Sequence, residues 1–226
     1  MENCNREEVM DTVDFLGNLP EEDIVYVDKP GQASLKKISF EGIRLLYGRL
    51  KFIRESRVRI VSSGPYIEML FQLTGGREMH FTESGLHARV SGGQHNLFYI
   101  PDTEFYLEPS RLQNESITMQ VQFAEDYFNR FMPIENPLFA EFIAKVQVRQ
   151  AVAMSMPSLS ITPEMYSLLE GIVHCPRKGF TKQLFIETSV LKLLLLQFDQ
   201  YQISSGQKKP SNIRLHDIEK FEMVRT

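Results

Sequence analysis

Cysteine is scarce in this chain of 226 residues, with only Cys4 and Cys175. The two lie far apart and belong to no Cys-x-x-Cys or Cys/His cluster, which argues against a disulfide framework and against a zinc site. Long apolar runs are also missing, because the most apolar stretch, residues 191–201, is about half as long as a membrane-spanning helix. The N-terminus is acidic and unlike a secretory signal. We therefore expect a cytoplasmic protein without a membrane partner.

Positive charge is not in excess either, since the chain has 25 Lys and Arg residues and 29 Asp and Glu residues. Binding to a nucleic-acid backbone needs clustered cationic side chains. The main contact with DNA, if the protein makes one, is therefore not expected in these residues. The apolar share of 42% and the charged share of 24% are ordinary for a folded globular protein.

The first half of the chain has the pattern of successive β-strands. Residues 24–123 contain short segments rich in β-branched and aromatic residues, separated by Gly, Pro, Asn and Ser clusters. Within 117–123 the apolar side chains alternate with Thr and Gln. Many evenly spaced antiparallel strands predict a barrel, a sandwich or a jelly roll, and such a shape offers an interior.

From about residue 124 the period changes to that of helices, so the predicted fold class is α+β. Thr162 and Thr181 are expected to cap two of these helices, and Pro163 suits a first helical turn. The predicted helices cover 124–132, 136–154, 162–176 and 181–202.

The helix at 182–201 is apolar around nearly its whole circumference, so it must be covered on more than one side. A central helix within one subunit is one explanation. The interpretation we prefer is a homodimer in which this helix contacts a second copy. The predicted dimerisation residues are Phe185, Leu191, Leu194, Leu195 and Phe198.

Signatures of catalysis are missing from the sequence. The metal-bearing cupin enzymes hold their ion with a tight His-x-His pair, a nearby Glu and a later His. Here no two histidines lie within two residues of each other, although folding could still bring His80 and His87 together. No GxSxG, GxGxxG or Walker motif occurs. We expect no catalytic residue, no metal ligand and no cofactor.

A barrel interior could still bind a small-molecule effector. Six cations lie between residues 44 and 59, and any that points inward would suit an acidic ligand: Arg44, Arg49, Lys51, Arg54, Arg57 and Arg59. An outward position is the default, since an unpaired buried guanidinium is costly. The predicted ligand-binding residues are Arg44, Tyr47, Tyr66, Met69, His80 and Tyr99.

The order of these parts resembles the regulatory half of AraC/XylS-type transcription factors, in which a cupin-like β-barrel (jelly roll) is followed by a helical dimerisation subdomain, a short linker and a first helix. The likeness is greatest in ITPEMYSLLEGIVHCPRKGFTKQLFIETSVLKLLLLQFDQY (161–201), which is similar to the PchR-like subgroup, and it extends to GGQHNLFYIP (92–101) and AEDYFNRFM (124–132). The resemblance implies an effector-sensing and dimerisation region, with siderophores among the candidate effectors. It also implies DNA binding through a C-terminal helix-turn-helix domain that begins in RLHDIEKF and is missing after Thr226.

The predicted organisation therefore has five parts. They are an N-terminal arm (1–23), the barrel (24–123), the helical dimerisation region (124–202), a linker (203–213) and the start of a truncated DNA-binding domain (214–226). Two other functions remain open at this stage. One is a metal-dependent cupin enzyme, and the other is a cyclic-nucleotide-type sensor, which shares the order of β-roll and dimer helix.

Overall fold

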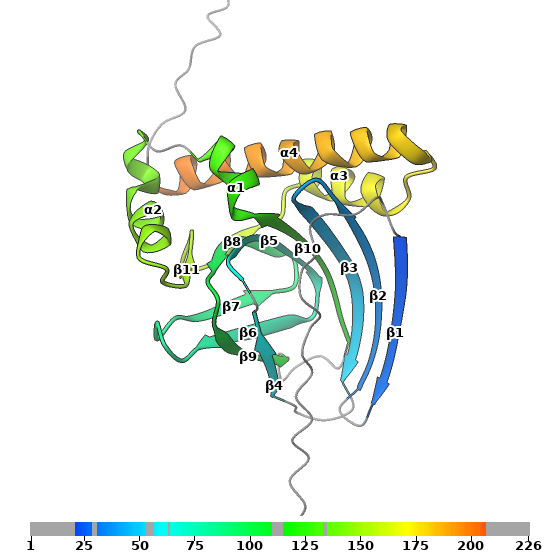
Figure 1. Cartoon of the computed structure of the whole chain (residues 1–226), viewed down its shortest axis with the longest axis horizontal. Helices are drawn as coiled ribbons and strands as arrows, with labels where there is room; N and C mark the ends of the chain where they lie inside the picture. The colour runs from blue at the N-terminus through cyan, green and yellow to red at the C-terminus, as the bar shows by residue number, and fades with distance from the viewer. Residues whose placement is uncertain are drawn as a thin grey trace, which may run out of the picture.

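The computed structural model of the chain describes residues 21–28, 31–52, 57–62, 64–109, 115–132 and 135–206. Two antiparallel sheets face each other as a barrel, and helices lie across the larger sheet (Figure 1). The larger sheet has the order β1 (Glu21–Asp28), β2 (Gly31–Phe40), β3 (Ile43–Phe52), β10 (Glu115–Ala124), β5 (Tyr66–Thr74), β8 (Gln94–Ile100) and β11 (Val152–Ala153), with β12 (Leu159–Ser160) also on β8. The smaller sheet has the order β4 (Val58–Val61), β9 (Glu104–Pro109), β6 (Gly76–Phe81) and β7 (His87–Ser91).

Period-two alternation in the central strands divides the apolar residues between two cores. Along β5, Ile67, Met69 and Phe71 face the helices, whereas Tyr66 and Leu70 face the smaller sheet across the barrel interior. Gly75, between β5 and β6, has a φ of +75°, and a Cβ there would lie 2.7 Å from the carbonyl oxygen of Glu115. Glycine therefore lets the chain turn from one sheet into the other.

The helical part follows β10. Its elements are α1 (Glu125–Phe128), two 3₁₀ turns (Asn129–Phe131 and Pro137–Phe139), α2 (Ala140–Gln147), α3 (Pro163–Val173) and α4 (Gly179–Ser204). The prediction of an α+β fold with an antiparallel barrel followed by helices is confirmed. Thr162 caps α3 as predicted, because its hydroxyl accepts a hydrogen bond from the Met165 N–H at 3.2 Å. The predicted cap at Thr181 is wrong, since α4 already begins at Gly179 and Thr181 lies in its first turn.

The predicted helix over 136–154 is also too long. α2 ends at Gln147, Arg149 has a φ of +56°, and the Gln150 N–H donates to the Lys145 carbonyl oxygen. Val152 and Ala153 then pair with β8 at the edge of the larger sheet. Tertiary pairing of these residues outweighs the local helical pattern, as is common for short apolar segments.

Several predictions fall outside the described residues. They concern Cys4, Arg54, His216, most of the N-terminal arm, most of the linker and the start of the DNA-binding domain at 214–226. In the part of the chain that the structure describes, no helix is long and apolar enough to cross a bilayer.

Candidate functional site

A group of polar and charged side chains lies inside the barrel, and we call it the interior polar cluster. Its members are Arg44, Tyr66, Glu68, Gln72, Arg77 and Gln122, all of them buried. Cross-strand register explains why they meet: Gln122 of β10 is paired with Arg44 of β3 on one side and with Glu68 of β5 on the other. Paired residues in neighbouring strands point to the same face of a sheet. Arg77 reaches the cluster from β6 of the smaller sheet.

Hydrogen bonds hold most of this cluster in place. The Arg77 Nε–H donates to Gln72 Oε1 at 3.0 Å, and Gln72 Nε2 donates to Ser116 Oγ at 2.6 Å. Gln122 Nε2 donates to Glu68 Oε2 at 3.0 Å. In contrast, Nη2 of Arg77 has no hydrogen-bond acceptor among the described residues. The residue is only 6% exposed, so water does not replace the missing acceptor. A buried donor without an acceptor is costly, and it is a group that a bound anion could satisfy.

Burial also changes the ionisation of these groups. Desolvation raises the pKa of Glu68, partly offset by the hydrogen bond from Gln122 and by the charge of Arg77. Burial raises the pKa of Tyr66 well above its ordinary value, and the Glu68 charge adds to that rise. Burial lowers the pKa of Arg77. Ionisable groups perturbed in this way are typical of binding sites, because burying them serves the hydrophobic core poorly.

The six predicted ligand-binding residues do not meet in one place. Arg44 and Tyr66 point into the interior, so the hypothesis that a cation of the 44–59 stretch points inward holds for Arg44. Tyr47, Met69 and Tyr99 belong to the opposite face, packed in the core beneath the helices. His80 lies on the outer face of the smaller sheet, because its neighbours Met79 and Phe81 are the ones that point inward. A shift of one position along a strand moves a side chain to the other face.

Sequence reasoning missed four members of the cluster: Glu68, Gln72, Arg77 and Gln122. A signal for three of them was present, since Glu68 and Gln72 alternate with apolar residues in YIEMLFQL, as Gln122 does in ITMQVQF. Polar residues at every second position normally indicate a solvent-facing side of a strand. Only the second sheet, which closes over this face, turns those positions into an interior.

A separate pocket of about 260 Å³ opens near the end of β6. Glu83, Thr103, Arg149 and Gln150 contribute to its wall, and Phe81 and Ala151 connect it to the core of the interior. No member of the interior polar cluster lines it. We place the candidate site in the cluster because buried charges converge there.

The larger sheet connects this interior to α4 through buried polar contacts. His95 of β8 faces the helices, where its Nδ1 lies 2.9 Å from Gln197 Nε2 and its Nε2 lies 2.5 Å from Gln200 Oε1. Gln197 Nε2 also donates to the Asn96 carbonyl oxygen at 3.3 Å, which fixes the orientation of this amide. His95 Nδ1 must therefore accept, so the ring is neutral with its proton on Nε2. Burial lowers the pKa of His95, which agrees with a neutral ring.

The opposite side of α4 carries exposed apolar residues, although Phe198 packs edge-on against Phe139 of its own subunit. Leu184 and Leu195 are 49% and 59% exposed, and Leu191 and Phe198 are partly buried. Together with Thr188 and Gln202 they follow alternating steps of four and three residues, which is the spacing of a coiled-coil seam. Of the other predicted dimerisation residues, Phe185 is partly covered by Arg177, and Leu194 is 3% exposed in the core of its own subunit.

The sequence of the chain matches the model of one protein family. The profile described as regulatory protein PchR N-terminal domain matches residues 34–215, which is most of the chain. No curated protein sequence matches significantly.

Solved structures with a similar fold have low sequence identity to this chain. They include an ectoine synthase from P. lautus (14% identity, TM-score 0.34, 52% of this chain and 76% of that chain) and an RmlC-like cupin from Shewanella frigidimarina (9% identity, TM-score 0.33, 47% and 89%). An HTH_3 family transcriptional regulator from Vibrio cholerae is similar over 41% of this chain, at 13% identity and a TM-score of 0.32. The present chain spans about half, 51%, of that regulator. At such values these likenesses say nothing about activity or ligand.

Proposed function

Because the chain belongs to the family of PchR N-terminal regulatory domains, we propose that it is the effector-sensing and dimerisation region of an AraC-type DNA-binding transcriptional regulator. In this proposal the interior polar cluster binds a small molecule, α4 joins two copies, and the bound state is passed to a DNA-binding domain. The chain itself catalyses no reaction and acts in the cytoplasm.

The observation that carries the proposal is the Nη2 donor of the Arg77 guanidinium group, which is buried inside the barrel. Arg77 Nη2 is buried and has no acceptor within the part of the chain that the structure describes, and Arg44 lies within the same interior. A ligand with a carboxylate or phenolate oxygen would satisfy this donor through a charge-assisted hydrogen bond. Glu68 and Tyr66 can complement polar groups elsewhere on the ligand. Ferric siderophores, which the family resemblance suggested, present anionic oxygens of this kind and remain candidates.

An enzymatic function has less support from the residues of the interior. Among the described residues, no histidine side chain faces the interior polar cluster: His80 and His87 lie on the outer face of the smaller sheet, and His95 faces α4. Glu68 alone does not provide the several N and O ligands that a catalytic metal centre requires. We therefore prefer effector binding to metal-dependent catalysis.

Transmission would use the sheet that the site and α4 share. β5, β8 and β10 carry interior residues on one face and pack against helices with the other. A ligand shifts an equilibrium only if it binds one arrangement better than another. A small change in strand position on effector binding would alter the contacts of His95 and Asn96 with Gln197, Gln200 and Tyr201, and so the position of α4.

The effector site can be tested by thermal denaturation in the presence of salicylate, 2,3-dihydroxybenzoate, citrate and ferric siderophores. At a concentration about 100-fold above Kd, a true effector stabilises the protein by about 2.7 kcal/mol, which raises the Tm by about 5–10 °C. Arg77→Met should abolish this rise, while Arg49→Met, at the exposed surface, should preserve it. A Tm rise of equal size in wild type and Arg77→Met would refute the site.

Dimerisation through the outer face of α4 has its own test. Leu195→Glu places a charge in the middle of the seam and should convert a dimer to a monomer in sedimentation at tens of micromolar. Met156→Glu is the matched control, because Met156 is also an exposed apolar residue but lies outside α4. A wild-type monomer under these conditions would remove the dimer from the proposal.

A further inference from the structure

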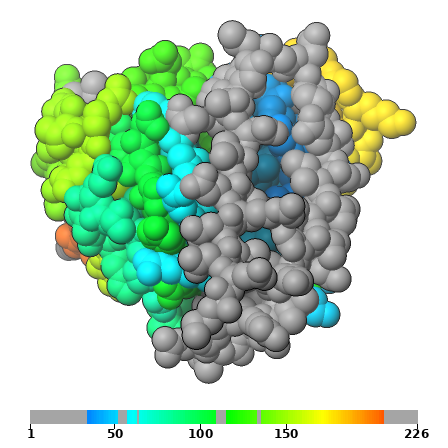
Figure 2. Space-filling view, turned by 60° about the horizontal axis from the view of Figure 1, so that its bottom comes forward, coloured from blue at the N-terminus to red at the C-terminus, as the bar shows by residue number. Residues whose placement is uncertain are grey.

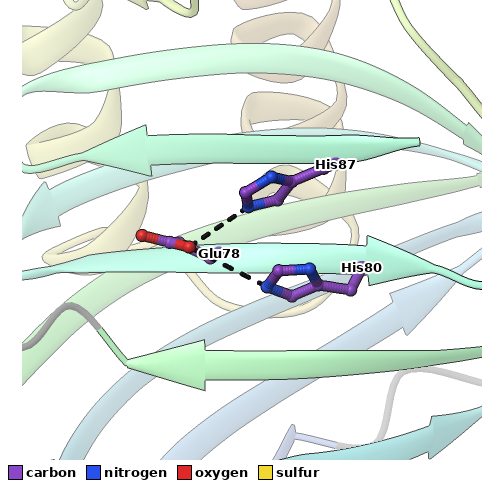
Figure 3. A group of neighbouring side chains, drawn as sticks. All are labelled: Glu78, His80 and His87. Atoms are coloured by element: carbon purple, nitrogen blue, oxygen red, sulfur yellow. Dashed lines mark hydrogen bonds and ion pairs between the residues drawn. The ribbon is translucent and has the colours of Figure 1, made fainter. Parts of the chain in front are cut away.

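Three potential metal ligands converge on the outer face of the smaller sheet (Figure 3). Glu78, His80 and His87 each offer one ligand atom, and these atoms all lie within 4.8 Å of one another. His87 Nε2 lies 3.1 Å from Glu78 Oε2, and His80 Nε2 lies 3.8 Å from the same oxygen. The surface of β6 and β7 is visible in teal in the space-filling view (Figure 2).

The hairpin geometry brings these residues together. His80 of β6 and His87 of β7 are paired directly across the strands, and Glu78 lies two residues before His80 on the same face. The imidazole rings stack with centroids 4.1 Å apart. The two histidines are too far apart in sequence to form a His-x-His motif, which is why we expected no metal ligand. A tight antiparallel hairpin produces the same proximity from residues seven positions apart.

One ring nitrogen of this group makes no hydrogen bond to the residues that the structure describes. His80 Nε2 is buried and has no hydrogen-bond acceptor or donor among the described residues. It points towards the carboxylates of Glu78 and, at 3.9 Å, Glu108. A buried ring nitrogen that makes no hydrogen bond and lies beside carboxylate oxygens is placed where a metal ion could bind to both kinds of group.

We propose that Glu78, His80 and His87 bind one divalent transition-metal ion, with Zn²⁺ as the representative. Two imidazole nitrogens and a carboxylate oxygen form a donor set that Zn²⁺ and neighbouring ions favour. In tetrahedral geometry, metal–ligand bonds of about 2.0–2.1 Å separate the ligand atoms by about 3.3 Å. The His87–Glu78 distance of 3.1 Å is already close to this value, and the His80–Glu78 distance of 3.8 Å needs an adjustment of about 0.5 Å, which side-chain rotation can provide.

The surrounding charges leave room for a cation. Glu108 of β9 is positioned to provide a fourth oxygen, although its carboxylate also lies 3.4 Å from Arg57 Nε. Arg89 lies 3.9 Å from Glu78 Oε1, not from the Oε2 that faces the histidines, and its side chain is exposed. The ion would join β6, β7 and β9 on the outer side of the barrel. This site is separate from the effector site, since the cluster residue Arg77 leaves β6 on the opposite face.

Zn²⁺ titration of the untagged, metal-free protein tests the proposal, with calorimetry and thermal denaturation as readouts. One equivalent should bind per chain, and the Tm should rise by about 5 °C or more once Zn²⁺ exceeds Kd about 100-fold. His87→Gln should weaken binding at least tenfold, as should Glu78→Gln. His87 is exposed, so its variant should keep the wild-type Tm without metal. His174→Gln is the control, because His174 is an exposed histidine at the end of α3.

The result expected is a loss of Zn²⁺ affinity in the Glu78 and His87 variants and none in the His174 variant. Failure of wild type to bind a stoichiometric equivalent would overturn the proposal. So would binding that His87→Gln and Glu78→Gln leave unchanged, because the ion would then have other ligands. His80→Gln gives a further check, with the metal-free Tm reporting whether that variant folds.

Discussion

The two faces of the larger sheet differ in what they bury. The face beneath the helices is mainly apolar, with Ile67, Met69 and Phe71 of β5 packed against α3 and α4. The face inside the barrel carries buried charges on the same strand and its neighbours, among them Glu68 and Arg44. Both faces are buried, so burial does not explain the difference. The helix-facing side stabilises the fold, whereas the interior side accepts the cost of buried charge, which suits a binding function.

The largest effect is expected on the helix-facing side. Phe71→Ala should lower the free energy of unfolding by about 3–5 kcal/mol, because Phe71 is completely buried and its removal leaves a cavity. Denaturant unfolding at constant pH measures this loss. Met156→Ala, at an exposed position, should change the same quantity by less than about 0.5 kcal/mol. A similar small change for Phe71→Ala would mean that this core is not tightly packed.

The polar contacts of α4 should have the next largest effect. Gln197→Leu removes the donor from His95 Nδ1 and from the Asn96 carbonyl oxygen, and leaving buried acceptors unpaired costs about 1–3 kcal/mol. Amide hydrogen exchange should become faster in the last turns of α4, while exchange in β5 stays slow. Unchanged exchange in α4 would show that these contacts do not hold the helix in place.

The interior charges should contribute little to stability when they are replaced together. Glu68→Gln combined with Arg77→Met should leave the free energy of unfolding within about 1 kcal/mol of wild type, since replacing buried charges that interact is often neutral. Arg77→Met alone should cost more than the double variant, because it leaves the Glu68 charge without its cationic neighbour. Denaturant midpoints for the full double-mutant cycle give both values. A large additive loss in the free energy of unfolding would mean that these interior residues stabilise the fold, as the helix-facing residues do.

The smallest effect expected is a dependence of stability on pH. Burial lowers the pKa of His95, so the unfolded chain takes up a proton at a higher pH than the folded protein does. The stability contributed by neutral His95 is thus complete above about pH 6.5 and declines as the pH falls below that value. His95→Gln should reduce the loss of stability measured between about pH 7.5 and pH 5.5 relative to wild type. An equal loss in both proteins would contradict the assignment.

The sequence predicted an element correctly where residues close in the chain determine it, and not where contacts with distant residues do. Strand alternation over 117–123, the Thr162 cap and the apolar helix at 182–201 depend on neighbouring residues and were predicted correctly. The end of α2 at Gln147 was not, because Val152 and Ala153 are paired with a strand about fifty residues earlier.

The residues of the candidate site could not be predicted for the same reason, because contacts between distant parts of the chain bring them together. Whether Glu68 faces water or an interior depends on a second sheet whose position no local pattern specifies. Four of the predicted ligand residues (Tyr47, Met69, His80 and Tyr99) lie outside the interior polar cluster, because the face of a strand changes with every residue. The convergence of His80 and His87 likewise depends on the hairpin register between β6 and β7.

Hydrogen exchange measured by mass spectrometry tests the central claim most directly, namely that a ligand in the interior polar cluster is sensed by α4. The ligand would be whichever of the tested anions raises the Tm most in wild type and fails to do so in Arg77→Met. We predict slower exchange in β5 and β6 together with a changed exchange rate in the last turns of α4, and the change in α4 should vanish in Gln197→Leu. Altered exchange confined to β5 and β6, or centred on the pocket beside Arg149, would contradict the account.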